Sequence, residues 1–173
     1  MRKKGTAILF DGPNFHHSLV RMGFRLDFEA LERYCHENYG DVLIRRYYAS
    51  GGNILPPEFV AFLISKGYEV VVTPQVDTQI TVDAVDMISR GEVSTIVLVS
   101  SDGSYFPLVK YAHESGVRMV IAHDQDFQGF AMLLKGAIRL GLADYINIRE
   151  FQKEVPAPGL PHVEGLGEEL PSV

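Results

Sequence analysis

Two aspartates follow apolar runs of this sequence at equivalent places. Asp11 comes directly after the run TAILF of residues 6–10, and Asp102 comes just after the run TIVLVS of residues 95–100. If these runs are neighbouring strands, both carboxylates lie at one edge of a sheet, where their repulsion favours a shared divalent cation. Taken singly, each aspartate is explained equally well as a side chain that closes a turn at a strand end. The pair at matching positions favours a metal site.

A third acidic candidate, Asp77, opens a segment with helical periodicity. The apolar residues of this segment, 77–90, form one stripe if the helix is ideal: Ile80, Ala84, Met87 and Ile88. With about 100° per residue, Asp77 lies within roughly 35° of the centre of that stripe and Asp83 roughly 85° away. Asp86 points to solvent. Asp77 is therefore predicted to face inward, as a metal ligand or as an N-cap, and Asp83 to support the site.

Polar and aromatic side chains near these aspartates are further candidates. Asn14 belongs to the turn DGPN of residues 11–14, so it either orients Asp11 or simply caps a helix. His16 follows that turn and could contact a phosphate. His113 and His123 are expected at the surface or in capping positions. Of the pair at residues 47–48, one tyrosine must face the core, and the other could stack on a base.

The elements that carry these residues alternate between strand and helix. Apolar runs predict strands at residues 6–10, 42–49, 68–73, 95–100, 117–122 and 145–148. Helices are predicted at residues 15–22, 28–37, 57–65, 77–90, 107–115 and 127–140. This alternation predicts an α/β fold, in which a mainly parallel sheet of five or six strands lies between two layers of helices. All the carboxyl ends of the strands then lie at one edge, where open α/β sheets bind ligands.

Length, composition and charge restrict the classes of protein. The 173 residues suit one domain at residues 1–151, followed by a flexible tail rich in Pro, Gly and Glu at 152–173. The single cysteine, Cys35, cannot form an internal disulfide, and no apolar run is long enough for a membrane span, so a cytoplasmic protein is expected. The net charge of −6 weakens the case for nucleic-acid binding without excluding it. A homodimer is compatible with the sequence.

Five blocks of the sequence resemble, in order and spacing, the NYN domain family, the LabA-like group of PIN-like nucleases. They are ILFDGPNF, which resembles the opening DGxN motif, RRYYASGG, VDTQITVD, VLVSSDGSYFPLV, which resembles the SGDxDFxPL block, and LADYINI with Asp144. The resemblance covers residues 6–148. It implies a PIN-like α/β sandwich, RNA as the substrate, and Mg²⁺ or Mn²⁺ as the cofactor.

Carried over by position, the resemblance implies a metal site and its neighbours. Asp11, Asp77 and Asp102 would be the catalytic metal ligands. Asn14, Asp83 and Ser104 would support them, and His16 and Ser101 would contact the substrate. The chain departs from the family pattern at Ser104, where the second aspartate of SGDxDF is expected, and at Ser101, where glycine is expected. Asp124 and Asp126 could replace the missing carboxylate, or cap a turn.

Three functions follow from these residues. The leading hypothesis is a ribonuclease that hydrolyses phosphodiester bonds with the help of a metal. The alternative is a catalytically weakened or inactive RNA-binding or regulatory module on the same fold, for which Ser104 and the negative charge are the evidence. A nucleotide phosphohydrolase is weaker, because the sequence lacks the glycine-rich phosphate loops GxxxxGK and GxGxxG.

Overall fold

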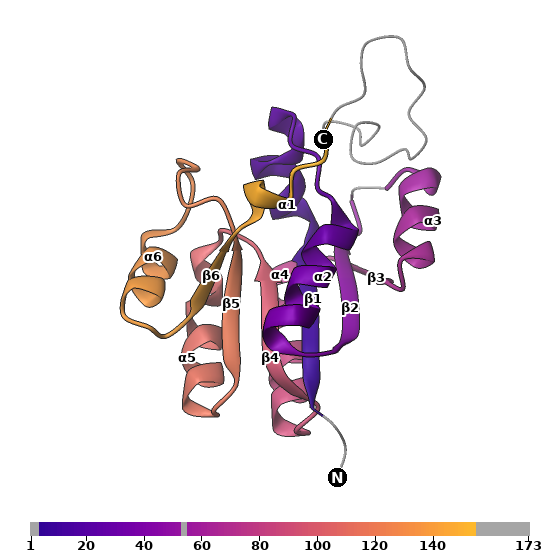
Figure 1. Ribbon diagram of the computed structural model, residues 1–173. Helices are drawn as coiled ribbons and strands as arrows, with labels where there is room; N and C mark the ends of the chain where they lie inside the picture. Colours follow the sequence, from indigo (N-terminus) through magenta and orange to yellow (C-terminus); the bar gives the residue numbers. More distant parts are fainter. Residues whose placement is uncertain (1–3, 53–54, 155–173) are drawn as a thin grey trace.

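Six parallel strands form a single sheet at the centre of the molecule, in the order β3-β2-β1-β4-β5-β6 (Figure 1). The structure is a computed structural model that describes residues 4–52 and 55–154. The strands are β1 (Gly5–Asp11), β2 (Val42–Ser50), β3 (Glu69–Thr73), β4 (Val93–Val99), β5 (Arg118–His123) and β6 (Asp144–Asn147). Every neighbouring pair is parallel. The predicted α/β sheet is confirmed.

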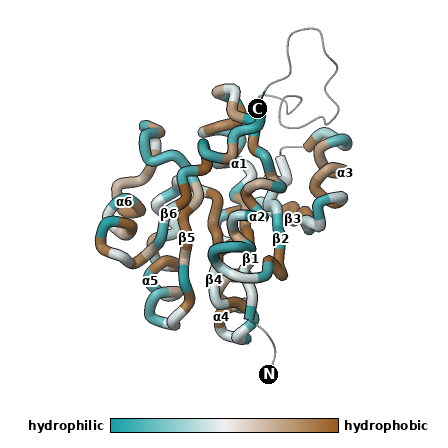
Figure 2. The backbone as a smooth tube through the Cα atoms, in the orientation of Figure 1, coloured by the Kyte–Doolittle hydropathy of each residue, from teal (hydrophilic) through white to brown (hydrophobic). Residues whose placement is uncertain are grey.

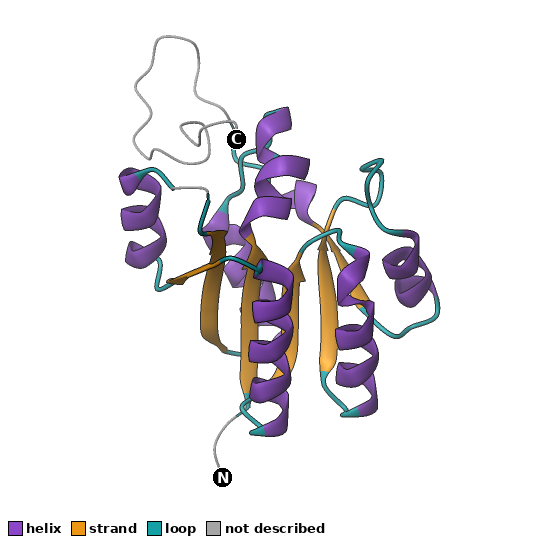
Figure 3. Ribbon diagram, turned by 180° about the vertical axis from the view of Figure 1, so that it is seen from behind, coloured by secondary structure: helices purple, strands orange, loops and turns teal. Residues whose placement is uncertain are grey.

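Helices cover both faces of the sheet, so the fold has three layers (Figures 1 and 3). One apolar core packs the sheet against α1 (Gly12–Ser18), α2 (Phe28–Tyr39) and α3 (Pro57–Ser65). The other core packs it against α4 (Val76–Ser89), α5 (Phe106–Glu114) and α6 (Met132–Arg139). Figure 2 shows hydrophobic residues along the central strands, which is the pattern of a parallel sheet buried on both faces. This is the three-layer, PIN-like sandwich that the sequence predicts.

Two predicted helices differ from the structure by three residues or more at one end or both, and the other four agree to within two residues. The helix expected at residues 15–22 begins at Gly12, because Pro13 suits the first turn, and it ends at Ser18. A short 3₁₀ turn, Val20–Met22, follows, and Gly23 closes that turn with a φ of 95°. The helix expected at residues 127–140 begins only at Met132, because residues 125–129 form turns.

The strand order determines where the site lies. From β1 the chain builds the sheet in one direction through β2 and β3, then returns to the other side of β1 for β4, β5 and β6. The order therefore reverses between β1 and β4. Ligands of open α/β sheets bind at such a reversal, beyond the carboxyl ends of the strands. Asp11 ends β1 at this edge, and Asp102 follows β4.

The carboxyl-terminal part of the chain packs against the start of α2. A 3₁₀ turn, Ile148–Phe151, is followed by Gln152, which forms an isolated antiparallel bridge with Leu26. The N–H of Lys153 donates to the carbonyl of Arg25 at 2.7 Å. The predicted tail begins at Gln152, and its residues 155–173 lie outside the described part of the chain. Within the described residues, no helix has the length and apolarity needed to cross a membrane.

Candidate active site

Asp11 is a buried carboxylate at the sheet edge, with only 5% of its surface exposed. It also caps α1: its Oδ1 accepts from the N–H of Asn14 at 3.2 Å. Its Oδ2 accepts from the Tyr105 hydroxyl at 2.9 Å and from the Ser100 hydroxyl at 3.3 Å. Burial raises the pKa of Asp11; the hydrogen bond from Tyr105 opposes the rise, and the charge of Asp102 adds to it. The site thus contains an acid whose charged form lacks a full counter-charge.

Gly12 allows the chain to turn at Asp11. A Cβ at this position would lie 2.3 Å from the carbonyl oxygen of Tyr48 and 2.7 Å from Cε1 of Tyr47. Real Cβ atoms do not approach backbone so closely, so a side chain would push α1 away from β2. Pro13 then enters the first turn of α1, where its missing N–H costs no hydrogen bond. The DGPN turn is therefore required by packing as well as by chemistry.

Asp102 lies on the turn after β4 and is exposed. Its Oδ1 accepts from the N–H of Ser104 at 2.9 Å, which caps the 3₁₀ turn Gly103–Tyr105. Its own N–H donates to Oγ of Ser100 at 3.1 Å. The Ser100 hydroxyl donates in turn to Asp11, so one serine links the two acidic turns. Because β1 and β4 are neighbours, the two carboxylates lie at one edge, as the sequence predicts.

Asp77 lies in the first turn of α4 and is half-buried. The N-cap of α4 is Gln75, and Oδ1 of Asp77 accepts from the N–H of Thr78 at 2.9 Å, so Asp77 does not cap the helix. The pKa of Tyr105 is raised first by burial and then by the charges of Asp11, Asp77 and Asp102. Of these three acids, Asp11 alone hydrogen-bonds to the Tyr105 hydroxyl, at 2.9 Å.

Asn14 connects the turn after β1 to the turn after β4. Its Nδ2 donates to Oγ of Ser101 at 3.0 Å, and its Oδ1 accepts from the N–H of Ser101 at 3.0 Å. Ser101 is 1% exposed and lies between Ser100 and Asp102. The Asn14 amide therefore holds the Asp11 and Asp102 turns together. Ser101 was predicted to contact substrate, and its hydroxyl and N–H are turned toward Asn14.

The other predicted residues lie around this centre in different settings. Asp83 accepts from the Tyr48 hydroxyl at 2.8 Å and from Nε2 of Gln79 at 2.8 Å, and pairs with Arg46 at 3.5 Å. It thereby fastens α4 to β2. Ser104 is exposed and His16 is half-buried. The tyrosine at 47 is 1% exposed and Tyr48 is fully buried, so the prediction that one of them stacks on a base is wrong.

Tyr105, Ser100 and His123 are the residues that sequence reasoning missed. Tyr105 occupies the phenylalanine position of the SGDxDF block, and its extra hydroxyl was the available signal. His123 ends β5 and is 0% exposed, so the prediction of a surface or capping role is wrong. Burial lowers its pKa to about 4. Strand-end position was again the signal, because His123 ends β5 as Asp11 ends β1.

The other aspartates considered from the sequence, Asp124, Asp126 and Asp144, have structural contacts away from Asp11. Asp124 accepts from the N–H of Asp126 at 2.8 Å and forms an ion pair with Arg149. This is the turn-capping role, and the bonds to Arg149 and the Asp126 N–H lower the Asp124 pKa although burial opposes them. Asp144 begins β6, at the opposite edge of the sheet from Asp11, and pairs with Arg118 at 3.4 Å.

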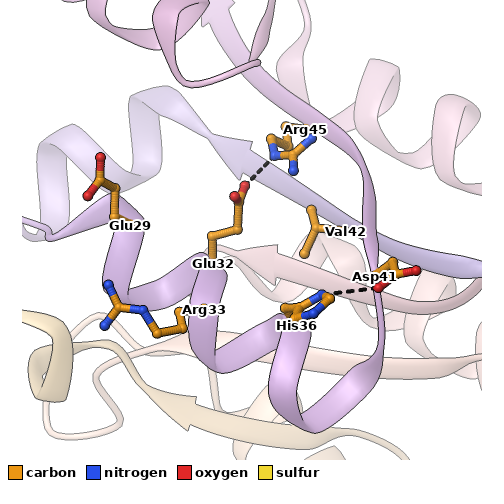
Figure 4. A pocket seen from close by; sticks show the side chains of 7 residues that line it. All are labelled: Glu29, Glu32, Arg33, His36, Asp41, Val42 and Arg45. Atoms are coloured by element: carbon orange, nitrogen blue, oxygen red, sulfur yellow. Dashed lines mark hydrogen bonds and ion pairs between the residues drawn. The ribbon is translucent and has the colours of Figure 1, made fainter.

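A second feature is a polar cavity of about 480 Å³ between α2 and the start of β2 (Figure 4). Two pairs of its side chains interact across it, Glu32 with Arg45, and Nδ1 of His36 with Asp41 at 3.2 Å. Val42 opens β2, so this cavity lies toward the amino ends of the strands. It is separate from the edge that carries Asp11.

The carboxylates at the sheet edge fit a hard divalent cation by their chemistry. Oxygen ligands suit Mg²⁺ and Mn²⁺. A bound cation would offset the cost of burying the charged Asp11 carboxylate and its repulsion from Asp102, which together raise the pKa of Asp11. Within the described residues, no group of three or more His, Cys, Asp or Glu converges closely enough to hold a metal ion. Mg²⁺ commonly binds through one or two carboxylates and completes its shell with water and substrate phosphates. Asp11 and Asp102 match that kind of site.

Comparison with known proteins agrees with the fold. The chain is 26% identical over 149 residues to the uncharacterized protein MJ0482 of Methanocaldococcus jannaschii; the match covers 84% of this chain and 56% of that protein. The chain thus spans little more than half the length of this relative. The sequence model of the NYN domain matches residues 5–133, from β1 into α6. The chain therefore belongs to the NYN domain family, in the PIN-like nuclease superfamily.

Proposed function

We propose that this protein is a ribonuclease that uses Mg²⁺ or Mn²⁺, with Asp11, Asp77 and Asp102 as its metal-binding and catalytic acids. One observation carries the proposal: Asp11 at the end of β1 and Asp102 after the neighbouring strand β4 lie at one edge of the sheet, where Ser100 hydrogen-bonds to both turns. Membership of a nuclease superfamily whose members generally use divalent metals supports it. The bound cation would neutralise charge on the attacked phosphate and lower the pKa of a water molecule.

The protein's own residues hold Asp11 in one orientation. A carboxylate has about four acceptor positions, and Asn14, Ser100 and Tyr105 use three of those of Asp11. The position left over is on Oδ1, so Asp11 would contact a cation through a single oxygen. Asp102 would supply the second carboxylate from its exposed turn.

The supporting residues have separate roles in this proposal. Asn14 fixes the distance between the two acidic turns through Ser101. Asp83 supports the site by holding α4, and therefore Asp77, against β2. Ser104 would hold a water where the family pattern has an acid, and the half-buried His16 would contact a phosphate of the RNA.

The alternative remains an RNA-binding or regulatory module of the same fold that does not cut. Ser104 favours it, because a hydroxyl cannot act as a general base or metal ligand as a carboxylate does. The net charge of −6 favours the regulatory form of this alternative, since it weakens contacts with the phosphates of an RNA substrate. A homodimer, a cytoplasmic location and the division into residues 1–151 and 152–173 are further proposals from the sequence.

Cleavage of end-labelled RNA with Mn²⁺ tests the proposal. Asp102→Asn keeps the shape of the side chain and removes its charge. We expect it to lose more than the roughly 10- to 100-fold in activity that loss of an outer-shell partner costs. Asp86→Asn is the matched control, because Asp86 is an exposed acid on α4 paired with Arg90 at 3.0 Å. Equal activity of the two variants would contradict the proposed site.

The alternative gives a different result in the same experiment. It predicts that wild-type protein cleaves no RNA with Mn²⁺ and that RNA binding persists in EDTA. The ribonuclease predicts cleavage that EDTA abolishes.

A further inference from the structure

A chain of short hydrogen bonds runs from the end of β5 to the turn after β1. Nε2 of His123 lies 2.7 Å from Oγ of Ser18, and Oγ of Ser18 lies 2.6 Å from the carbonyl oxygen of Asn14. His123 is 0% exposed and Ser18 is 3% exposed. Three strands are therefore connected at this edge, because Asn14 also bonds to Ser101 after β4.

The available protons determine which atom donates in each of these hydrogen bonds. A carbonyl oxygen only accepts, so the single hydroxyl proton of Ser18 points at Asn14. Both ring nitrogens of His123 face an acceptor, Nε2 the Oγ of Ser18 at 2.7 Å and Nδ1 the carbonyl oxygen of Asp124 at 3.4 Å. The contact to Ser18 has the length of a good hydrogen bond and the contact to Asp124 does not, so we assign the single proton of the neutral imidazole to Nε2. Burial lowers the pKa of His123 to about 4, so the ring is neutral near pH 7. Successive bonds of one direction polarise and strengthen each other.

Asn14 is held from three sides by this arrangement. Its carbonyl accepts from Ser18, its N–H donates to Asp11, and its side-chain amide binds Ser101. His123 itself is fixed by ring contacts with Phe127 and Phe130, whose centroids lie 5.5 Å and 5.8 Å away. The series of hydrogen bonds therefore starts at His123, which the aromatic rings hold in place. It ends at Asn14, the residue that links the two acidic turns.

We propose that His123 is a positioning residue of the site: through Ser18 it sets the orientation of Asn14, and Asn14 sets the separation of Asp11 from Asp102. His123 forms no hydrogen bond with either carboxylate, and its route to them runs through Ser18 and Asn14. The expected consequences for metal binding and RNA cleavage rest on the proposed function. The expected effect on Asn14 does not.

The first test follows the Asn14 side-chain amide by NMR in metal-free protein. Ser18→Ala and His123→Phe each break the chain, and the phenylalanine keeps a ring between Phe127 and Phe130. Both should reduce the exchange protection of the Asn14 amide by about tenfold or more, whereas His123→Gln, which retains a donor near Nε2, should preserve it. Thr6→Val is the matched control, since it removes a buried hydroxyl that bonds to Tyr39 at 3.2 Å at the far end of β1.

An unchanged Asn14 amide in Ser18→Ala would overturn the proposal, even if His123→Phe failed to fold. The second readout is Mn²⁺ affinity, which should fall about tenfold in Ser18→Ala, the size typical of an outer-shell partner. At saturating Mn²⁺ the rate of cleavage should fall while KM for RNA stays constant, because the ion is then bound in both proteins. If wild-type protein neither binds Mn²⁺ nor cuts RNA, the proposed function fails, and the NMR result still decides the role of His123.

Discussion

At the scale of single residues, Asp11 is an acid that the protein stabilises only in part. Three donors contact its carboxylate, yet burial and the charge of Asp102 still raise its pKa. A folded state that binds a proton more tightly than the unfolded chain loses stability as pH rises through that pKa. Ionised Asp11 therefore destabilises the metal-free protein at neutral pH, as expected of a group kept for function.

Asp11→Asn should consequently stabilise the metal-free protein at pH 7. The gain is expected to be on the order of 1 kcal/mol, or a rise of about 2–4 °C in Tm for a chain of this size. Below the unfolded pKa of Asp, about pH 3.9, the difference should disappear because both side chains are neutral. Thermal unfolding in EDTA across this pH range measures it. Mn²⁺ should then raise the Tm of wild type and leave that of Asp11→Asn unchanged.

A variant less stable than wild type in EDTA at pH 7 would contradict this account of Asp11. It would mean that the hydrogen bonds to the carboxylate outweigh its desolvation.

At the scale of elements, the site depends on the close contact between the first residue of α1 and the backbone of β2. Gly12 lies against the backbone of Tyr48, and α1 begins there directly after Asp11. The direction in which Asp11 points is thus set by backbone packing between β1, β2 and α1. Strand order places the second acid of the site, because β4 lies beside β1 and brings the Asp102 turn to the same edge.

Gly12→Ala should destabilise the fold by about 1–3 kcal/mol, the usual effect of overpacking. It should also abolish Mn²⁺ binding, since the turn that holds Asp11 must move. Gly51→Ala is the matched control on the loop after β2, where an added Cβ meets nothing within 4 Å and the φ angle is not positive. Urea unfolding and Mn²⁺ titration of the two variants make the comparison. Wild-type Mn²⁺ affinity in Gly12→Ala would show that the turn does not position a ligand.

The elements also show what the sequence could and could not predict. The apolar runs predict the strands, and the strand ends predict the edge that holds Asp11 and Asp102. Helical periodicity predicts that Asp77, in the first turn of α4, faces inward. The hydroxyl of Tyr105 on Asp11 could not be derived in the same way, because that contact joins residues 94 positions apart. His123 was misjudged for the same reason: its burial depends on Phe127 and Phe130, which lie in turns where a helix was predicted.

At the scale of the whole molecule, charge distinguishes this protein from most that bind nucleic acid. The net charge is −6, and several cations are already paired with carboxylates. These pairs include Arg45 with Glu32, Arg46 with Glu69, Arg118 with Asp144 and Arg149 with Asp124. The net negative charge and these pairs weaken the attraction for phosphates, so a bound divalent ion would supply an important part of the attraction for RNA.

The affinity for single-stranded RNA should therefore depend only weakly on salt. Each phosphate that a cationic side chain neutralises adds about −0.7 to the slope of log K against log salt, and we expect a slope no steeper than about −2. Fluorescence anisotropy at several KCl concentrations and constant Mn²⁺ measures it. Cleavage-deficient Asp102→Asn serves for comparison, and its affinity should fall. A slope of about −4 or steeper would point to a basic surface as the main RNA contact.

The central claim is that Asp11 and Asp102 hold one divalent cation between the ends of β1 and β4. Anomalous scattering from a crystal soaked in Mn²⁺ tests it most directly. We predict one peak within about 2.0–2.6 Å of an oxygen of each of these carboxylates, with Oδ1 as the contact from Asp11. A fully occupied peak elsewhere, such as beside Asp124, or no peak at this edge at millimolar Mn²⁺, would contradict the account.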